Sequence, residues 1–208
     1  MFPSNNELLE NTKEVLKDKY LHVFFTWLLI QIVMQGIGSQ YIYEEIYDFG
    51  LIAGVVYTFF NIFITACLSA GLVSYFIKIS RGEGLNFKSI FGFFSSFKAL
   101  LILILLLFVL IPMFILFVIP GIYFSMKYSQ VFFILADNPN VGVFEAFSRS
   151  SRLMNGRKMQ LFFYSLRMMF FLFLGVFTIF IWWIWLIPKF NVGLANFYNA
   201  LLESSDTK

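Results

Sequence analysis

Long apolar runs alternate with short charged segments along the chain. A helix needs about 17 to 25 residues to cross a hydrocarbon core that is roughly 30 Å thick. Three runs without a charged residue meet this length, at residues 20–37, 51–77 and 99–119. A fourth run, 161–187, contains only Arg167 as a charge. We therefore expect an all-α, polytopic integral membrane protein.

Two shorter apolar runs, 121–136 and 189–203, are each predicted to form the second helix of a hairpin. With them, the chain has about six transmembrane helices arranged as three hairpins. A re-entrant loop is the alternative for residues 121–136, because sixteen helical residues span only about 24 Å.

The charged segments between the runs predict the orientation of the protein. The loop 38–50 carries Glu44, Glu45 and Asp48 but no base, whereas segments 78–98 and 137–160 carry an excess of Lys and Arg. Because short basic segments stay on the cytoplasmic side, we expect both basic segments and both termini in the cytoplasm. The predicted location is the bacterial plasma membrane.

The segment 99–136 joins two cytoplasmic segments, so it must cross the membrane an even number of times. A tight turn at Pro120-Gly121 would allow this return. Pro120 and Pro188 both follow an isoleucine near the end of a long apolar run. Proline suits the first turn of a helix, so we expect each to open the second helix of its hairpin.

An amphipathic segment precedes each hairpin. In residues 87–97, the apolar Phe87, Ile90, Phe94 and Phe97 share one side at helical spacing, and residues 143–154 show a similar division. Residues 7–19 are a more polar version. The chain is therefore predicted to form a single membrane domain of three units, 1–77, 78–136 and 137–208, each an interfacial helix followed by a hairpin.

The stretch ILADNP, residues 134–139, marks the point where the apolar run 121–136 stops. Asp137 and Asn138 are turn-forming residues, and Pro139 disfavours continuation of the helix. We interpret the three residues as a structural turn at the membrane surface, in addition to the turns predicted at Pro120 and Pro188.

The segment that follows is predicted to lie on the inner leaflet. Phe144 and Phe147 would insert into the bilayer, and four bases would contact anionic lipid head groups. These bases are Arg149, Arg152, Arg157 and Lys158.

Polar residues inside the spans form a candidate intramembrane site. Lys127 lies in the run 121–136, with Tyr123 and Gln130 at helical spacing on its face. Arg167, Asn61 and Thr65 complete the set. One interpretation is a polar cavity that favours anionic groups; the other is hydrogen bonding between helices.

Composition narrows the possible functions. With 60% hydrophobic and 13% charged residues, the chain is far from soluble averages, and a net charge of +3 is too small to indicate nucleic-acid binding. The lone His22, the lone Cys67 and the lack of a carboxylate inside the predicted spans, apart from Glu203 at the last position of 189–203, leave no catalytic or metal-binding constellation. We therefore expect no enzyme activity, no cofactor and no metal. The mixed charges of the first twenty residues are unlike a secretory signal, so we expect no cleavage.

The motif ILADNP, followed by FEAFSRSSRLMNGRKMQLF, resembles the signature of a bacterial multipass membrane family known as domain of unknown function nine-seven-five. The resemblance covers most of the chain. That family is similar in turn to the membrane domain of some glycerophosphodiester phosphodiesterases, which implies a six-helix scaffold and no established activity.

Two functions remain. The first is a non-catalytic scaffold or accessory subunit of a membrane complex, for export or for resistance to membrane-active peptides, with other membrane subunits as partners. The second is a small transporter or lipid-handling protein with a polar intramembrane cavity. The sequence leaves the oligomeric state open.

Overall fold

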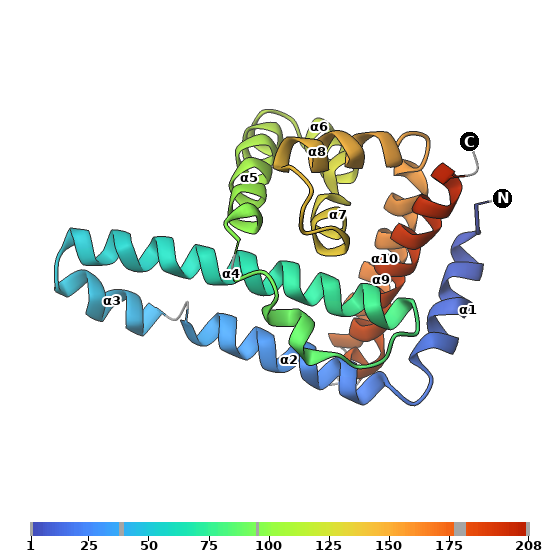
Figure 1. The fold of residues 1–208 in the computed structure, drawn as a ribbon, viewed down its shortest axis with the longest axis horizontal. Coiled ribbons are helices and arrows are strands. Elements are labelled where there is room, and N and C mark those ends of the chain that lie inside the picture. The colour runs from blue at the N-terminus through green and yellow to red at the C-terminus, as the bar shows by residue number, and fades with distance from the viewer. Residues whose placement is uncertain (1, 38–39, 95, 177–181, 207–208) are drawn as a thin grey trace.

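The computed structural model describes residues 2–37, 40–94, 96–176 and 182–206, and these residues form helices and no strand (Figure 1). The prediction of an all-α chain is confirmed. The elements, in order, are α1 (Asn5–Leu16), α2 (Tyr20–Ile37), α3 (Gln40–Asp48), α4 (Leu51–Ser80), the 3-10 helix η1 (Phe87–Phe91), α5 (Lys98–Leu116), α6 (Val118–Tyr128), α7 (Val131–Asp137), α8 (Val143–Leu153), α9 (Lys158–Val176) and α10 (Trp183–Asp206).

Four segments of the described chain are long and apolar enough to cross a membrane. They are Tyr20–Ile37, Leu51–Ser80, Lys98–Ile115, and Val118–Asp137, which comprises α6 and α7. The first two form a long hairpin that projects from the remaining helices (Figure 1), and α5 packs against α6. The polytopic membrane class is therefore confirmed, whereas the two crossings expected after residue 160 stay predictions.

The segment expected as an outer loop is largely helical. Residues 40–48 form α3, which packs against α4 and contains no glycine or proline that would interrupt it. Gly50 follows at φ 120°, a conformation that favours glycine, and it turns the chain into α4. The Tyr57 hydroxyl donates a hydrogen bond to the Ile37 carbonyl and ties α4 to the end of α2.

The turn of the second hairpin lies earlier than predicted. Phe117 adopts an extended conformation between α5 and α6, so Pro120 is the third residue of α6 rather than the turn itself. A proline clashes with the carbonyl four residues before it, here that of Leu116, so Pro120 disfavours continuation of α5 through this point. The same run is also not one straight helix, because α6 ends at Tyr128 and α7 begins at Val131.

Pro188 does not open a helix, contrary to the prediction. It lies inside α10, five residues after the helix begins at Trp183. It has no N–H to donate to the carbonyl of Ile184, and tertiary packing of α10 outweighs this local defect. Residues 177–181, which belong to the predicted run 161–187, lie outside the described residues.

The predicted amphipathic helix at 87–97 is also wrong in form. Residues 87–91 make a short 3-10 helix, and residues 92–94 and 96–97 form turns and irregular structure. Ile90 is buried, but Phe87, Phe94 and Phe97 are exposed, so they share no buried face. The close approach of this segment to α4 explains the arrangement, because a Cβ on Gly71 of α4 would overlap the Ile90 backbone.

The first and last helices lie side by side (Figure 1). α1 begins with a capping box formed by Ser4 and Glu7, and its buried Leu8 packs in one cluster with Phe197 and Leu201 of α10. α10 also packs against α2 and α4, and Figure 1 shows it running across the end of their hairpin. The three predicted units therefore interlock, since the first helix of the first unit packs on the last helix of the third.

Candidate functional site at the polar end of α10

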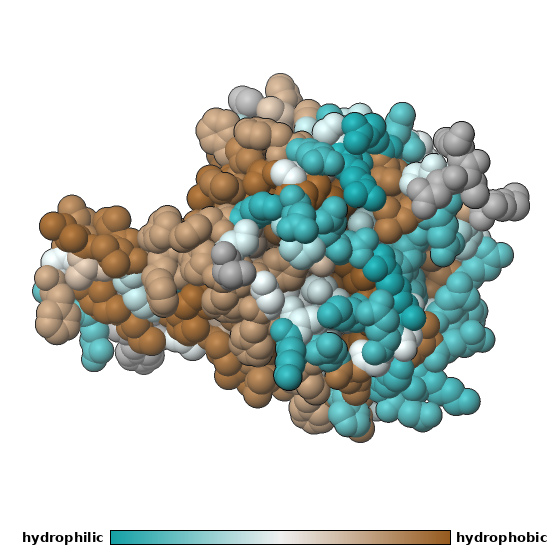
Figure 2. Space-filling model, in the orientation of Figure 1, coloured by the Kyte–Doolittle hydropathy of each residue, from teal (hydrophilic) through white to brown (hydrophobic). Residues whose placement is uncertain are grey.

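Polar and apolar surfaces are separated on the molecule. Figure 2 shows polar side chains gathered on the side where α10 and α1 lie and apolar side chains over the projecting α2–α4 hairpin. On the hairpin, Leu29 is 62% and Ile52 81% exposed, as expected of side chains that face lipid. Polar chemistry is therefore concentrated near α10.

A network of hydrogen bonds joins three helices at this polar end. Arg81, directly after α4, donates from Nη1 to Asp137 Oδ1 at 2.5 Å and from Nε to Asn199 Oδ1 at 3.1 Å. The buried Tyr198 hydroxyl donates to Asp137 Oδ2 at 3.2 Å, and Asn199 Nδ2 donates to Ser80 Oγ at 2.8 Å. The bond to Asp137 raises the pKa of the Arg81 guanidinium, which stays charged.

Asp137 and Asn138 have different roles in this arrangement. Asn138 Oδ1 accepts a hydrogen bond from the backbone N–H of Asn140 at 3.1 Å, which is the local contact expected of a turn residue. The Pro139 carbonyl accepts a bond from Lys98 Nζ at 2.8 Å. Asp137, by contrast, binds side chains of Arg81 and Tyr198 that are far away in sequence. The sequence pattern did not indicate this role of Asp137. The one available signal was the charge of Arg81, which is opposite to that of Asp137 and lies just after another predicted span.

Two pockets flank the end of α10. One, of about 610 Å³, lies between α1, α10 and the end of α4, and Arg81, Asn196 and Asn199 line it. The other, of about 360 Å³, lies between α8 and the last turns of α10. Its lining residues are Arg149, Arg152, Leu153, Asn155, Arg157, Leu201, Ser204 and Ser205.

The structure separates the four bases that were predicted to contact lipid head groups. Arg149, Arg152 and Arg157 line the same pocket. Lys158 lies elsewhere, with Nζ 4.7 Å from the centroid of the Tyr123 ring. The apolar face of α8 is also used within the protein, because the Phe147 ring packs 5.2 Å from Tyr128 whereas Phe144 is 80% exposed.

The candidate intramembrane residues have separate neighbours. Lys127 Nζ lies 5.4 Å from the Phe124 ring centroid and 5.1 Å from that of Tyr128, and Gln130 is buried with Nε2 donating to Ser129 Oγ.

Arg167 donates to Asn6 Oδ1 of α1 at 2.8 Å, and Asn61 and Thr65 lie on α4. Neither Tyr123 nor Gln130 is a hydrogen-bond partner of Lys127 in the described part of the chain. Of these contacts, the bond from Arg167 of α9 to Asn6 of α1 joins two helices, as the second interpretation of the set expects, whereas Phe124 and Tyr128 belong to the same helix as Lys127.

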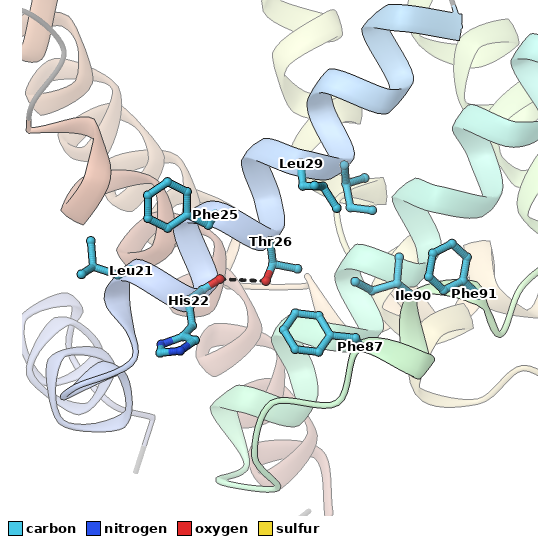
Figure 3. Close-up of a pocket in the computed structure, with 9 residues that line it drawn as sticks. Leu21, His22, Phe25, Thr26, Leu29, Phe87, Ile90 and Phe91 are labelled. Carbon is cyan, nitrogen blue, oxygen red and sulfur yellow. Dashed lines mark hydrogen bonds between the residues drawn. The ribbon is translucent and has the colours of Figure 1, made fainter.

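An apolar groove of about 570 Å³ lies between α2 and η1 (Figure 3). Its walls come from Leu21, Phe25 and Leu29 on one side and Phe87 and Phe91 on the other, and the Thr26 hydroxyl donates to the His22 carbonyl at 2.7 Å. Within the described residues, His, Cys, Asp and Glu form no cluster suited to a metal ion. The groove suits an apolar chain, and His22 is among the residues that line it.

Comparison with known proteins gives one match. Residues 101–205, just over half of the chain, match a family described as protein of unknown function (DUF975). No curated protein and no solved structure matches the chain. The match includes Asp137 and all three arginines of the pocket, while α1 to α4 lie before it. The similarity to the membrane domain of phosphodiesterases stays a prediction.

Proposed function

The chain belongs to the DUF975 family, and from its apolar helices we propose that it is a non-catalytic scaffold or accessory subunit of a complex in the bacterial plasma membrane. In this proposal, both termini face the cytoplasm and the partners are other membrane subunits, for example of an export system or of a system that resists membrane-active peptides.

The observation that carries this proposal is the projecting α2–α4 hairpin. Its outer half has apolar side chains exposed on both helices, among them Ile32 at 62%, Val56 at 63% and Phe60 at 59%. The tight α1–α10 packing is at the opposite end, so this half of the hairpin makes few contacts with the rest of the chain (Figure 1).

The contacts of the polar residues support the same proposal. Arg167 is bonded to α1, Arg81 to Asp137, and Lys127 lies over aromatic rings. The bonds of Arg167 and Arg81 hold separate segments together, which suits a protein that maintains a fixed shape, whereas Lys127 contacts rings of its own helix.

Site-specific photo-cross-linking in native membranes tests the proposal. A photoreactive phenylalanine analogue at Phe60 should give one discrete protein adduct, whereas the matched analogue at the 75% exposed Phe108 of α5 should give mainly lipid adducts. Purification in mild detergent should then recover the adduct partner in stoichiometric amount. Lipid adducts alone at both positions would contradict a subunit role for the hairpin.

A further inference from the structure

Three arginines converge on the 360 Å³ pocket beside α10. Arg149 and Arg152 come from α8, and Arg157 comes from the turn between α8 and α9. The opposite wall is the end of α10, with Ser204 and Ser205. The three cations thus come from one short segment and face a wall formed by residues about fifty positions later in the sequence.

The guanidinium groups have positioning contacts that leave their charge in place. The Arg157 guanidinium carbon lies 4.2 Å from the Phe2 ring centroid, and Phe2 packs edge-on against Phe197 at 5.4 Å. Arg152 Nη1 donates to Ser148 Oγ at 3.2 Å. Over the residues that the structure describes, the ion pairs join Lys13 to Glu10 and Arg81 to Asp137, and neither involves an arginine of the pocket.

The chemistry of the pocket selects an oxyanion. The planar guanidinium group matches the oxygen geometry of phosphate and can bind it through two parallel N–H bonds. The hydroxyls of Ser204 and Ser205 donate to the carbonyls of Leu201 and Leu202, which leaves the arginines as the donors for a ligand. A pocket of this volume is large enough for a phosphate group and its immediate substituents.

The surroundings point to a lipid as the source of the phosphate. Phe144, on α8, is 80% exposed, and Met159, two residues after Arg157, is 62% exposed. Exposed apolar side chains on the segment that carries a basic pocket are typical of a site at a membrane surface, where anionic lipids attract Lys and Arg. The geometry points to a specific site for the phosphate of an anionic phospholipid head group, formed by Arg149, Arg152 and Arg157 without Lys158. This inference requires the membrane location but no partner subunit.

Native mass spectrometry of the full-length protein in neutral detergent tests the site. The probes are dihexanoyl phosphatidylglycerol, dihexanoyl phosphatidylcholine and inorganic phosphate. Arg152→Gln should weaken phosphatidylglycerol binding about fivefold, and substitution of all three arginines by Gln about a hundredfold. Lys158→Gln makes the same change in charge and is the matched control, with affinity expected within about twofold of the unmodified protein. Arg152 is exposed and has no ring contact, so its single variant should fold even if the triple variant does not.

Each comparison has a result that would overturn the inference. Equal losses for Arg152→Gln and Lys158→Gln would show attraction by net charge instead of a pocket. Equal affinity for the two lipids would remove the selectivity for an anionic head group, since phosphatidylcholine carries the same phosphate but is neutral overall. Displacement of phosphatidylglycerol by an equal concentration of inorganic phosphate would assign the site to the free ion instead of a lipid.

Discussion

Replacement of Asp137 by alanine should destabilise the protein strongly, because its carboxylate joins α7 to Arg81 and to Tyr198 of α10. A hydrogen bond to a charged group contributes about 1.5–3 kcal/mol, and a buried hydroxyl left without a partner costs about 1–3 kcal/mol. The Tyr198 side chain is 1% exposed, so its hydroxyl would lose its acceptor away from water. The Arg81 and Asp137 side chains are 34% and 22% exposed, so solvent reduces the Coulomb part of their attraction. We expect a loss of about 3 kcal/mol in the free energy of unfolding.

Cys67 provides the assay. It is the single cysteine of the chain and it is 0% exposed, so a fluorogenic maleimide reacts with it only when the protein opens. Thermal unfolding of the full chain in detergent, followed by this reaction, gives a Tm. A loss of about 3 kcal/mol in a chain of this size lowers the Tm by roughly 6–12 °C.

Asn138→Ala is the matched control, one residue along the chain. Asn138 contributes a hydrogen bond within its own turn, so its replacement should cost about 1 kcal/mol, a shift of roughly 2–4 °C. Arg81→Gln combined with Asp137→Ala should cost less than the sum of the two single changes by about 1–2 kcal/mol, because they share one contact. Similar small shifts for Asp137→Ala and Asn138→Ala would refute the tertiary role and return Asp137 to the status of a turn residue.

Three further predictions use the same chain. Gly71→Ala should lower the free energy of unfolding by about 1–3 kcal/mol, since the added Cβ overlaps the Ile90 backbone. Gly36→Ala, where the added Cβ meets open space, should raise the free energy of unfolding by about 0.5–1 kcal/mol in the same Tm assay. In a cysteine-free background, an impermeant thiol reagent on intact cells should label Glu45→Cys but not the exposed Asn140→Cys; label at Asn140 would reverse the orientation. Lys127→Met removes contacts to two rings, each worth about 0.5–1 kcal/mol at exposed sites. The Tm should therefore fall by less than roughly 8 °C, and a larger fall would reveal a partner beyond the rings.

The apolar pattern was sufficient to predict the helices that face lipid. Residues 20–37 became α2 with the predicted bounds, because a charge-free run of that length has few alternatives in a membrane. The positions of turns were less predictable. Pro120 disfavoured a continuous helix, but the exact break depended on Phe117 and on the packing of Gly121 against Phe114. Pro188 shows the opposite case, where packing around α10 kept a proline inside a helix.

The candidate site was predictable only in its residue types. The sequence identified the bases of segment 143–158, but their division into a three-arginine pocket and a separate Lys158 depends on where the end of α10 lies. Likewise, the partner of Asp137 is fixed by the meeting of α4, α7 and α10. Helical spacing reports which residues share a face of one helix and contains no information about which helix that face meets.

The packing of α1 restricts where α10 can lie relative to a membrane. Asn196 Nδ2 of α10 donates to Thr12 Oγ1 of α1 at 2.9 Å, so the two helices pack closely. The outer face of α1 carries the Glu10–Lys13 ion pair, whose side chains are 66% and 50% exposed. A charge at the centre of a bilayer costs about 2.5–3.5 kcal/mol on insertion scales, so this face of α1 requires water. α10 lies beside α1 and runs across the end of the α2–α4 hairpin instead of along it (Figure 1). This arrangement favours a position in which one side of α10 lies at the membrane surface. The arginine pocket at the end of α10 would then lie at the level of the lipid head groups.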